Sequence, residues 1–219
     1  MRRLNGSSLL TLALLVLAAS ALLGAVALTR RTETARDERG NEPIRYVREP
    51  ERYARQGHSI GMARSPRRIV EFSDFECPYC KHLHHSLESL QVANPGRFLV
   101  VFRHFPIRDH LSSRPAAIAA ECAGSQGRFA EYAHTLFAAQ DSLGLIPWTE
   151  LASRAGVANS KAYEQCLADP EASRRVESDF EAGSELRING TPALLIGDSL
   201  YIGDLPVDTL ARKLGLITR

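Results

Sequence analysis

The sequence has no internal repeat, no large net charge and no second pair of closely spaced cysteines, and each absence narrows its possible functions. Without repeats it is not an array of repeated units, and a formal net charge of +2 over 219 residues is ordinary for a globular protein. The arginine-rich residues 30–68 alternate with Glu and Asp and carry few aromatic residues, unlike a nucleic-acid-binding surface. A structural zinc ion usually needs four ligands, often as two close pairs. We therefore expect neither nucleic acid nor structural zinc as a partner.

The chain is long enough for one well-packed domain and an additional segment. Its 44% hydrophobic and 24% charged residues are typical of a globular protein. The charge is unevenly divided: residues 30–68 hold eleven Arg and six acidic residues, whereas the part from Ile69 onward holds 14 basic and 19 acidic residues. The body of the protein is therefore mildly acidic, and the segment before it is basic.

An uncharged segment near the amino terminus predicts a membrane-directing helix. No charged residue occurs from Leu4 to Thr29, after a basic start. Its most apolar part, Leu9 to Leu28, would form a helix about 30 Å long, which is enough to cross the hydrocarbon core of a bilayer. We expect residues 1–29 to form an uncleaved signal anchor; the alternative is a signal peptide cleaved after Ala25-Val26-Ala27. Residues 30–56 lack apolar periodicity and are expected to form a basic, polar tether.

A strand, helix, strand unit is predicted in the first half of the body. The apolar run Ile69–Phe75 suits a buried strand, and Pro78 suits the first turn of a helix. From Cys80 onward, apolar residues recur at spacings of three, four and three, which marks one buried face of that helix. Asn94-Pro95-Gly96 ends the helix, and residues 97–102 supply a second strand, normally parallel to the first. This order places the close cysteine pair at the carboxyl end of a sheet strand.

The sequence Cys77-Pro78-Tyr79-Cys80 opens the helix and is the strongest functional signal in the chain. A thiol at a helix N-terminus faces unpaired backbone N–H groups and the positive end of the helix dipole, which favour the thiolate. Because the thiolate is the reactive form, we expect Cys77, at the exposed start of the helix, to be the nucleophile. Cys80, on the buried face, is then the resolving thiol. A metal site that adds His84 to the two thiols is the alternative.

The chain from about residue 57 resembles the thioredoxin-fold thiol:disulfide oxidoreductases of the DsbA type. The resemblance is carried by the run from Ile69 to Cys80 and by the later Gly190-Thr191-Pro192. It implies an α/β, thioredoxin-like fold over residues 57–219, interrupted by an all-helical insertion at about residues 113–187. The sequence has room for such an insertion, since this stretch is almost wholly helical in pattern.

The same resemblance implies roles for further residues. In the family, the proline matched by Pro192 is cis and lies beside the cysteine pair, so we expect Thr191 and Pro192, together with Pro78 and Tyr79, to contact the substrate. An acid within an apolar strand is costly without a partner or a role. Glu71 matches the buried acid that relatives use to relay a proton to or from the resolving thiol. A surface position for Glu71, and a proline that merely begins an edge strand, are the alternatives.

Two more cysteines, Cys122 and Cys166, fall within the predicted insertion. Four cysteines in an exported chain allow three pairings, and assigning the close pair to each other leaves these two. Some relatives carry such a second bond. We expect a structural disulfide between Cys122 and Cys166, with two buried free thiols as the alternative.

Taken with the resemblance, these features predict an extracytoplasmic enzyme that donates disulfides to cysteine-containing exported client proteins. We expect no bound cofactor or metal, and a single-pass anchor that holds the catalytic domain on the outer or periplasmic side of the cell membrane; a secreted or periplasmic form after signal cleavage is the alternative. The resemblance implies reoxidation by a membrane partner of the DsbB or vitamin K epoxide reductase type. The remaining alternatives are a reductase or isomerase of client disulfides and a metal- or client-binding module without redox turnover.

Overall fold

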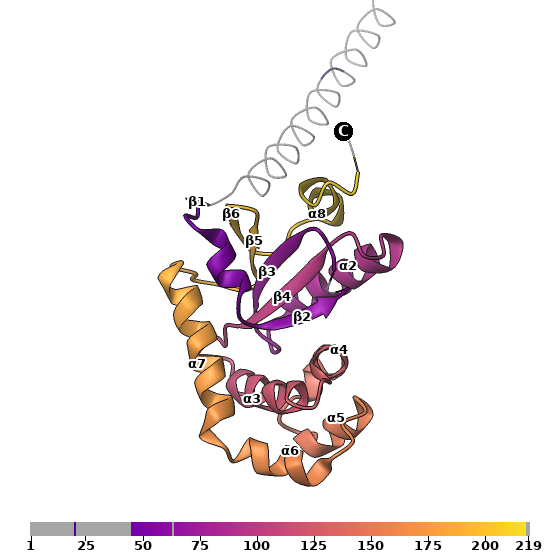
Figure 1. Cartoon of the computed structure of the whole chain (residues 1–219), viewed down its shortest axis with the longest axis vertical. Helices are drawn as coiled ribbons and strands as arrows, with labels where there is room; N and C mark the ends of the chain where they lie inside the picture. Colours follow the sequence, from indigo (N-terminus) through magenta and orange to yellow (C-terminus); the bar gives the residue numbers. More distant parts are fainter. Residues whose placement is uncertain (1–19, 21–44, 63, 218–219) are drawn as a thin grey trace, which may run out of the picture. The chain divides into compact units, whose positions relative to one another are not determined.

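The computed structural model describes residue 20 and residues 45–62 and 64–217 (Figure 1). The chain divides into two units, Met1–Glu42 and Pro43–Arg219. The expected signal anchor at residues 1–29 and the first part of the expected tether lie outside the described residues, apart from residue 20. Within the described part of the chain, no helix combines the length and the apolar character needed to cross a membrane.

The second unit is built on a mixed β-sheet. In the described residues, the sheet has six strands in the order β1-β6-β5-β3-β4-β2 (Figure 1). The strands are β1 (Arg45–Tyr46), β2 (His58–Gly61), β3 (Arg68–Ser73), β4 (Leu99–His104), β5 (Ala193–Ile196) and β6 (Ser199–Ile202). Only β3 and β4 pair in parallel, and the other neighbours are antiparallel. This is the thioredoxin-like α/β arrangement that the family resemblance implies.

Alternate residues of β3 face two different apolar layers, as the two-residue period of a strand requires. Ile69 belongs to a buried cluster with Leu83 and Leu210, whereas Val70 belongs to one with Tyr53. The elements that supply these layers are α2 (Pro78–Ala93), α8 (Val207–Lys213) and the 3-10 helix η1 (Pro50–Ala54). The sheet is therefore covered on one face by α2 and α8 and on the other by η1 and the later helix α7 (Pro170–Glu185).

Helix α2 is held by the apolar face that its sequence predicts. Cys80, Leu83, Leu87 and Leu90 are all buried. Burying a leucine side chain contributes about 1.5–3 kcal/mol, so these contacts fix the helix on the sheet. The helix ends before Asn94, whose backbone N–H and side-chain amide both donate to the Leu90 carbonyl, at 2.9 and 3.1 Å.

A helical subdomain lies between β4 and β5. Its elements are α3 (Ser113–Gly124), α4 (Phe129–Ala138), the 3-10 helix η2 (Gln140–Ser142), α5 (Trp148–Arg154), α6 (Ser160–Leu167) and α7 (Pro170–Glu185). Its core is apolar and includes Leu136 and Phe137, with the hydroxyl of Tyr163 donating to that of Tyr132 at 2.8 Å. The structure contains a disulfide between Cys122 of α3 and Cys166 of α6.

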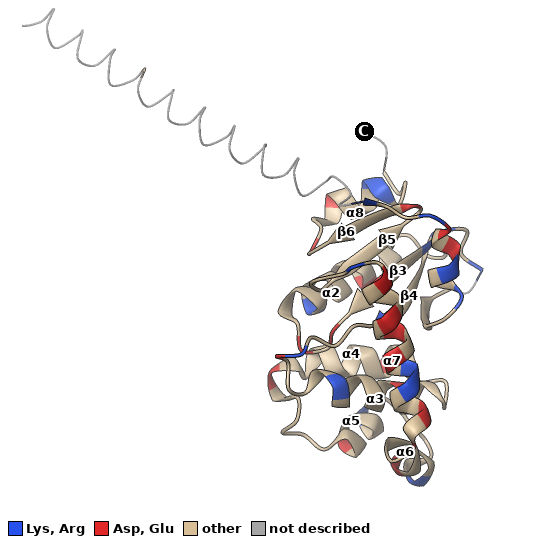
Figure 2. Ribbon diagram, turned by 90° about the vertical axis from the view of Figure 1, so that its left-hand side faces the viewer, with Lys and Arg blue, Asp and Glu red and all other residues tan. Residues whose placement is uncertain are grey.

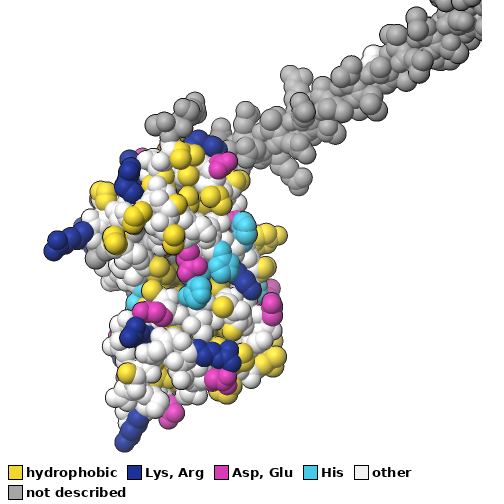
Figure 3. All heavy atoms as spheres, turned by 90° about the vertical axis from the view of Figure 1, so that its right-hand side faces the viewer, with side chains coloured by type: hydrophobic (Ala, Val, Ile, Leu, Met, Phe, Trp, Pro, Cys, Tyr) yellow, Lys and Arg dark blue, Asp and Glu magenta, His cyan; other side chains and the backbone are white. Residues whose placement is uncertain are grey.

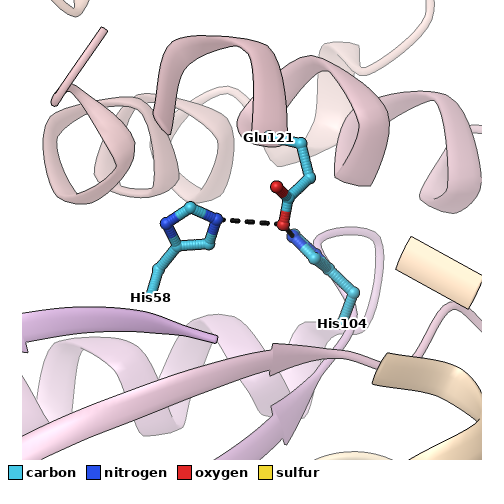
Figure 4. A group of neighbouring side chains, drawn as sticks. All are labelled: His58, His104 and Glu121. Carbon is cyan, nitrogen blue, oxygen red and sulfur yellow. Dashed lines mark hydrogen bonds and ion pairs between the residues drawn. The ribbon is translucent and has the colours of Figure 1, made fainter. Parts of the chain in front are cut away.

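A buried carboxylate connects this subdomain to the sheet. One oxygen of Glu121, on α3, lies 2.9 Å from His58 Nε2 of β2 and 3.1 Å from His104 Nε2 of β4 (Figure 4). The other oxygen accepts from Arg175 Nε of α7 at 2.6 Å. Burial by itself raises the pKa of Glu121, but the bonds from His104 and His58 outweigh it and hold that pKa far below its usual range. Glu121 therefore stays ionised as the common acceptor for three other elements.

Helix α7 returns the chain to the sheet and carries more acidic than basic residues (Figure 2). Asp179 bonds the Arg103 guanidinium of β4 and accepts from the backbone N–H of His104 at 2.9 Å. One turn later, a Cβ on Gly183 would stand 2.5 Å from Phe105 Cδ2 and 3.1 Å from Phe72 Cδ1. Only glycine permits this approach of α7 to the strands.

The expected tether extends too far along the chain. Residues 45–54, which the sequence places in it, belong to the fold in the structure: β1 pairs with β6, and Val47 and Tyr53 are buried. The carbonyl of Tyr53 also accepts from Arg103 Nη1 at 3.0 Å. Two isolated apolar residues among Arg and Glu carry no periodic signal, which is why the sequence does not reveal them. Strand β2 was not predicted either.

Candidate active site at Cys77 and Cys80

The close cysteine pair lies where β3 gives way to α2. The backbone N–H of Cys77 donates to the Asp74 carbonyl at 3.1 Å, which closes the turn after the strand. Cys77 is the N-cap residue, with an extended backbone, and its carbonyl accepts from Cys80 N at 3.1 Å and Lys81 N at 3.2 Å. Pro78 is the first helical residue, where a missing N–H costs nothing. The pair therefore lies at the carboxyl end of a sheet strand.

Both cysteines are free thiols, and both are buried. Cys80 is fully covered, and Cys77 is only 5% exposed. The expectation of an exposed Cys77 is therefore wrong, because a distant segment covers it: Cys77 Sγ lies 3.4 Å from the carbonyl oxygen of Thr191. Pro78 and Tyr79 remain exposed beside it, Tyr79 by 63%.

The two thiols differ sharply in acidity. A hydrogen bond from Cys80 is the main cause that lowers the pKa of Cys77 to about 5; burial opposes it, and contacts with Thr191 and the backbone N–H groups of Cys80 and Tyr79 add to it. Burial, followed by the bond to Cys77 and its charge, raises the pKa of Cys80 well above its ordinary value. At neutral pH Cys77 is a thiolate and Cys80 a protonated donor.

Glu71 lies on β3, on the same face of the strand as Ile69, and is buried. Its Oε1 has no hydrogen-bond partner among the described residues. Burial raises the pKa of Glu71 to about 7, while the nearby Ser73 hydroxyl opposes the rise. The negative charge of Glu71 contributes to the raised pKa of Cys80, which places the carboxyl within electrostatic reach of that thiol.

The loop that covers Cys77 carries the proline singled out in the sequence. The Thr191–Pro192 peptide bond is cis. Pro192 is buried and its carbonyl accepts from Gly203 N at 2.7 Å, which ties the loop to the chain after β6. Thr191 Oγ1 is buried with no hydrogen-bond partner in the described part of the chain. The structure thus brings Thr191 to Cys77, although 114 residues separate them.

Asp74 is a buried acid close to both thiols, and its charge is balanced locally. Its carboxylate accepts from Glu76 N, Ile107 N and His110 Nδ1, each at 2.8 Å. Burial lowers the pKa of His110, but the bond to Asp74 outweighs it, so that pKa is raised overall. The Asp74 backbone N–H also donates to Cys80 Sγ at 3.4 Å. These donors explain how an acid three residues before Cys77 is compatible with a thiolate there.

Sequence reasoning missed Gln140 and His110. Gln140 Nε2 donates to the carbonyls of Phe75 and Cys77 at 2.8 and 2.9 Å, so the insertion fastens the loop that carries the cysteine pair. No sequence signal identifies Gln140, which lies 63 residues from Cys77. A His a few residues after a predicted strand is a weak signal for His110.

The metal alternative at the cysteine pair has little geometric support. Among the described residues, two groups have three potential ligand atoms close together, and neither contains Cys77 or Cys80. His84, which that alternative needs as a third ligand, is grouped instead with Glu88 and His134.

Comparison with known proteins places this geometry in context. A family model described as thioredoxin matches residues 54–214. The Na(+)/H(+) antiporter NhaA 1 of Mycolicibacterium gilvum is 33% identical over 163 residues, which are 72% of this chain and 26% of that protein. NhaA 3 of Salinispora tropica is 31% identical over 155 residues, covering 70% of this chain and 24% of that protein. The chain spans about a quarter of the length of the curated relatives it matches.

Solved structures share the fold at low sequence identity. The thiol-disulfide exchange protein α-DsbA2 of Wolbachia pipientis has a TM-score of 0.62 and 21% identity, covering 84% of this chain and 98% of that one. The catalytic domain of Proteus mirabilis ScsC has a TM-score of 0.60 and 24% identity, covering 72% and 86%. A periplasmic thioredoxin-like protein of Salmonella enterica serovar Typhimurium has a TM-score of 0.64 and 22% identity, covering 78% and 98%.

Proposed function

This chain belongs to the thioredoxin family, and from that premise we propose that it is a thiol:disulfide oxidoreductase that exchanges a Cys77–Cys80 disulfide with client proteins. The observation that carries the proposal is the buried pair itself, in which a thiolate at Cys77 is paired with a protonated thiol at Cys80. Beside it lie the exposed Pro78 and Tyr79 and the carbonyl of Thr191, which suit contact with an extended client segment. Pro192 holds this loop in place from the buried side.

The exchange proceeds in two displacements. A client thiolate attacks Cys77 Sγ of the disulfide, and the electron pair of the S–S bond leaves on Cys80 Sγ. The Glu71 carboxyl, with a pKa of about 7, supplies the proton that Cys80 takes up. A second client thiolate then attacks the client sulfur of the mixed disulfide, and Cys77 leaves as a thiolate. The client loses two electrons, and the Cys77–Cys80 pair gains them.

We assign the direction of transfer to client oxidation. A pKa of about 5 at Cys77 favours the reduced enzyme at pH 7 by up to about 3 kcal/mol over an ordinary thiol, less after solvent screening. That free energy raises the reduction potential of the Cys77–Cys80 couple by about 60 mV, since two electrons are transferred. The Cys77–Cys80 disulfide is therefore a stronger oxidant than one formed by ordinary thiols. A reductase or isomerase is the competing assignment.

The setting of the reaction belongs to the same proposal. The Cys122–Cys166 disulfide is typical of an oxidising compartment, which supports an extracytoplasmic domain that acts on exported, cysteine-containing clients. We assign residues 1–29, which are uncharged from Leu4 to Thr29, to a single-pass anchor in the cell membrane. A membrane partner of the DsbB or vitamin K epoxide reductase type would reoxidise the pair.

Redox equilibrium of the full-length chain in glutathione buffers tests the function and its direction. A midpoint near the oxidising end supports a disulfide donor, a midpoint near that of thioredoxin supports a reductase, and the absence of any titration refutes thiol exchange. Trapping gives a second readout: Cys80→Ala should accumulate mixed disulfides with clients, whereas the matched Cys77→Ala should accumulate none. Equal trapping by both variants would contradict the assigned nucleophile.

A further inference from the structure

A second cluster of potential ligands lies on α2 and α4, apart from the thiols. Glu88 Oε1 lies 2.9 Å from His134 Nδ1 and 3.4 Å from His84 Nε2. The ligand atoms of these three residues all lie within 4.8 Å of one another. His85 Nδ1 is 3.5 Å from the other oxygen of Glu88. Three imidazoles therefore converge on one carboxylate.

His84 is the unusual member of this cluster. Its side chain is only 4% exposed, yet Nε2 makes no hydrogen bond to any described residue. Its ring packs on Phe137, at 4.8 Å between ring centroids, which fixes its orientation. Its polar neighbour Glu88 Oε1, at 3.4 Å, is too distant or poorly aligned for a hydrogen bond. A buried imidazole nitrogen without a hydrogen bond is costly, so the position of Nε2 next to Glu88 favours a ligand there.

The cluster is open to solvent on one side. His84, Glu88 and His134 line a surface hollow of about 610 Å³, which is ample for an ion with bound water. Histidine and acidic side chains gather on the corresponding face of the molecule (Figure 3). Glu88 and His134 are 35% and 54% exposed, so an ion can reach the site without unfolding.

We propose that His84, Glu88 and His134 form a binding site for a divalent transition-metal ion of the Zn²⁺ class. Imidazole nitrogen and carboxylate oxygen are standard zinc ligands at about 2.0–2.2 Å, which sets ligand atoms about 3.3–3.5 Å apart in a tetrahedron. The separations of 2.9 and 3.4 Å from Glu88 Oε1 approach this spacing, and since all three ligand atoms lie within 4.8 Å of one another, rotation of the exposed His134 side chain would adjust the rest. Water fills the fourth coordination position. His85 orients the Glu88 carboxylate through Oε2, the oxygen that does not bind the metal.

The other ligand cluster, at His58, His104 and Glu121, does not fit a metal as well (Figure 4). Glu121 already accepts from both imidazoles and from Arg175 Nε. His104 Nδ1 is buried without a partner among the described residues. An unpartnered Nδ1 fits the tautomer in which Nδ1 has no proton and Nε2–H donates to Glu121. A metal ion bound at Nε2 would require the proton on Nδ1, which would then be a buried donor without an acceptor.

A metal at the proposed site would join two layers of the molecule. His84 and Glu88 belong to α2, which begins at the cysteine pair, and His134 belongs to α4 of the helical subdomain. The ion would therefore fasten the subdomain to the active-site helix. This role is separate from thiol exchange and uses neither Cys77 nor Cys80.

Zinc binding by the full-length chain tests the site. The protein is held with Cys77 and Cys80 as a disulfide, so that neither thiol competes, and bound zinc is counted by mass spectrometry after equilibrium dialysis against ZnCl₂. We expect one Zn²⁺ per chain. Glu88→Gln and His134→Ala should each weaken the affinity by at least about tenfold.

Matched variants separate this site from others. His82→Ala removes an exposed histidine of the same helix, which bonds Asp204 instead, and should leave zinc binding unchanged. Zinc should raise the melting temperature of the wild type but not that of His134→Ala, which removes a side chain that is 54% exposed. No zinc binding by the wild type, wild-type affinity in Glu88→Gln and His134→Ala, or loss of binding on His58→Ala alone would each overturn the proposal.

Discussion

The acidity of Cys77 should depend on the thiol of Cys80 more than on the helix N-terminus. The hydrogen bond from Cys80 is the largest cause of the low pKa, ahead of the contacts with Thr191 and the backbone. A hydrogen bond to a charged group is worth about 1.5–3 kcal/mol. Since one pKa unit corresponds to about 1.4 kcal/mol, Cys80→Ala should raise the pKa of Cys77 by about one to two units.

Cys80→Ser is the matched control for this variant. A serine hydroxyl is smaller than a thiol but still offers a donor at the same position. The pKa of Cys77 in Cys80→Ser should therefore lie between those of the wild type and Cys80→Ala. The order of the three proteins tests the hydrogen bond itself, because the backbone at the start of α2 is common to all of them.

The assay is the rate of alkylation by iodoacetamide as a function of pH in the reduced protein. Cys122 and Cys166 are disulfide-bonded, and Cys80 is fully covered, so the reaction reports Cys77. We expect a midpoint near pH 5 for the wild type. If Cys80→Ala keeps that midpoint, the backbone N–H groups hold the thiolate and the leading role of the Cys80 hydrogen bond is refuted.

Three further changes test the buried charges and the disulfide, each by urea unfolding. The pKa of Glu71 is raised from 4.5 to about 7, so its contribution to stability is full below pH 4.5 and is lost as the pH rises through 7. Glu71→Gln should therefore increase the free energy of unfolding by up to about 3 kcal/mol at pH 8 and leave it unchanged at pH 4. An equal increase at both pH values would contradict this. Glu121 has a lowered pKa, so its contribution to stability is present above pH 4.5 and is lost in acid. Glu121→Gln should lower the free energy of unfolding by about 3 kcal/mol at pH 7 and by less at pH 3. The same loss at both pH values would argue against ion pairing. Replacing Cys122 and Cys166 by Ala opens a loop with a sequence separation of 44 and should cost about 4 kcal/mol without changing alkylation of Cys77; a change at Cys77 would show that the bond is not purely structural.

The active-site framework could be predicted because its signals are local. A run of apolar residues ending at Phe75, a proline at position 78 and a stripe that begins at Cys80 together define a strand, a turn and a helix. Those three features place the cysteine pair without reference to any distant residue. The apolar spacing of the later segments predicts helices, and the family resemblance implies that these helices form an insertion.

The covering of Cys77 could not be predicted, because it depends on a contact across 114 residues. The same is true of Gln140, which reaches the Cys77 carbonyl from a 3-10 helix. The causes of the Cys77 acidity also rank differently from the expectation. The helix N-terminus was expected to lead, whereas the bond from Cys80 is larger, and that ranking depends on interatomic distances that spacing does not give.

The absence of a side chain at position 183 affects the backbone that faces Cys77. Alanine there would place a methyl group against Phe105, and α7 would have to swing outward to make room. Thr191 follows soon after in the chain, beyond a short connection. The alignment of the carbonyl that faces Cys77 therefore depends in part on a position that packs against Phe105 and Phe72, outside the cysteine pair.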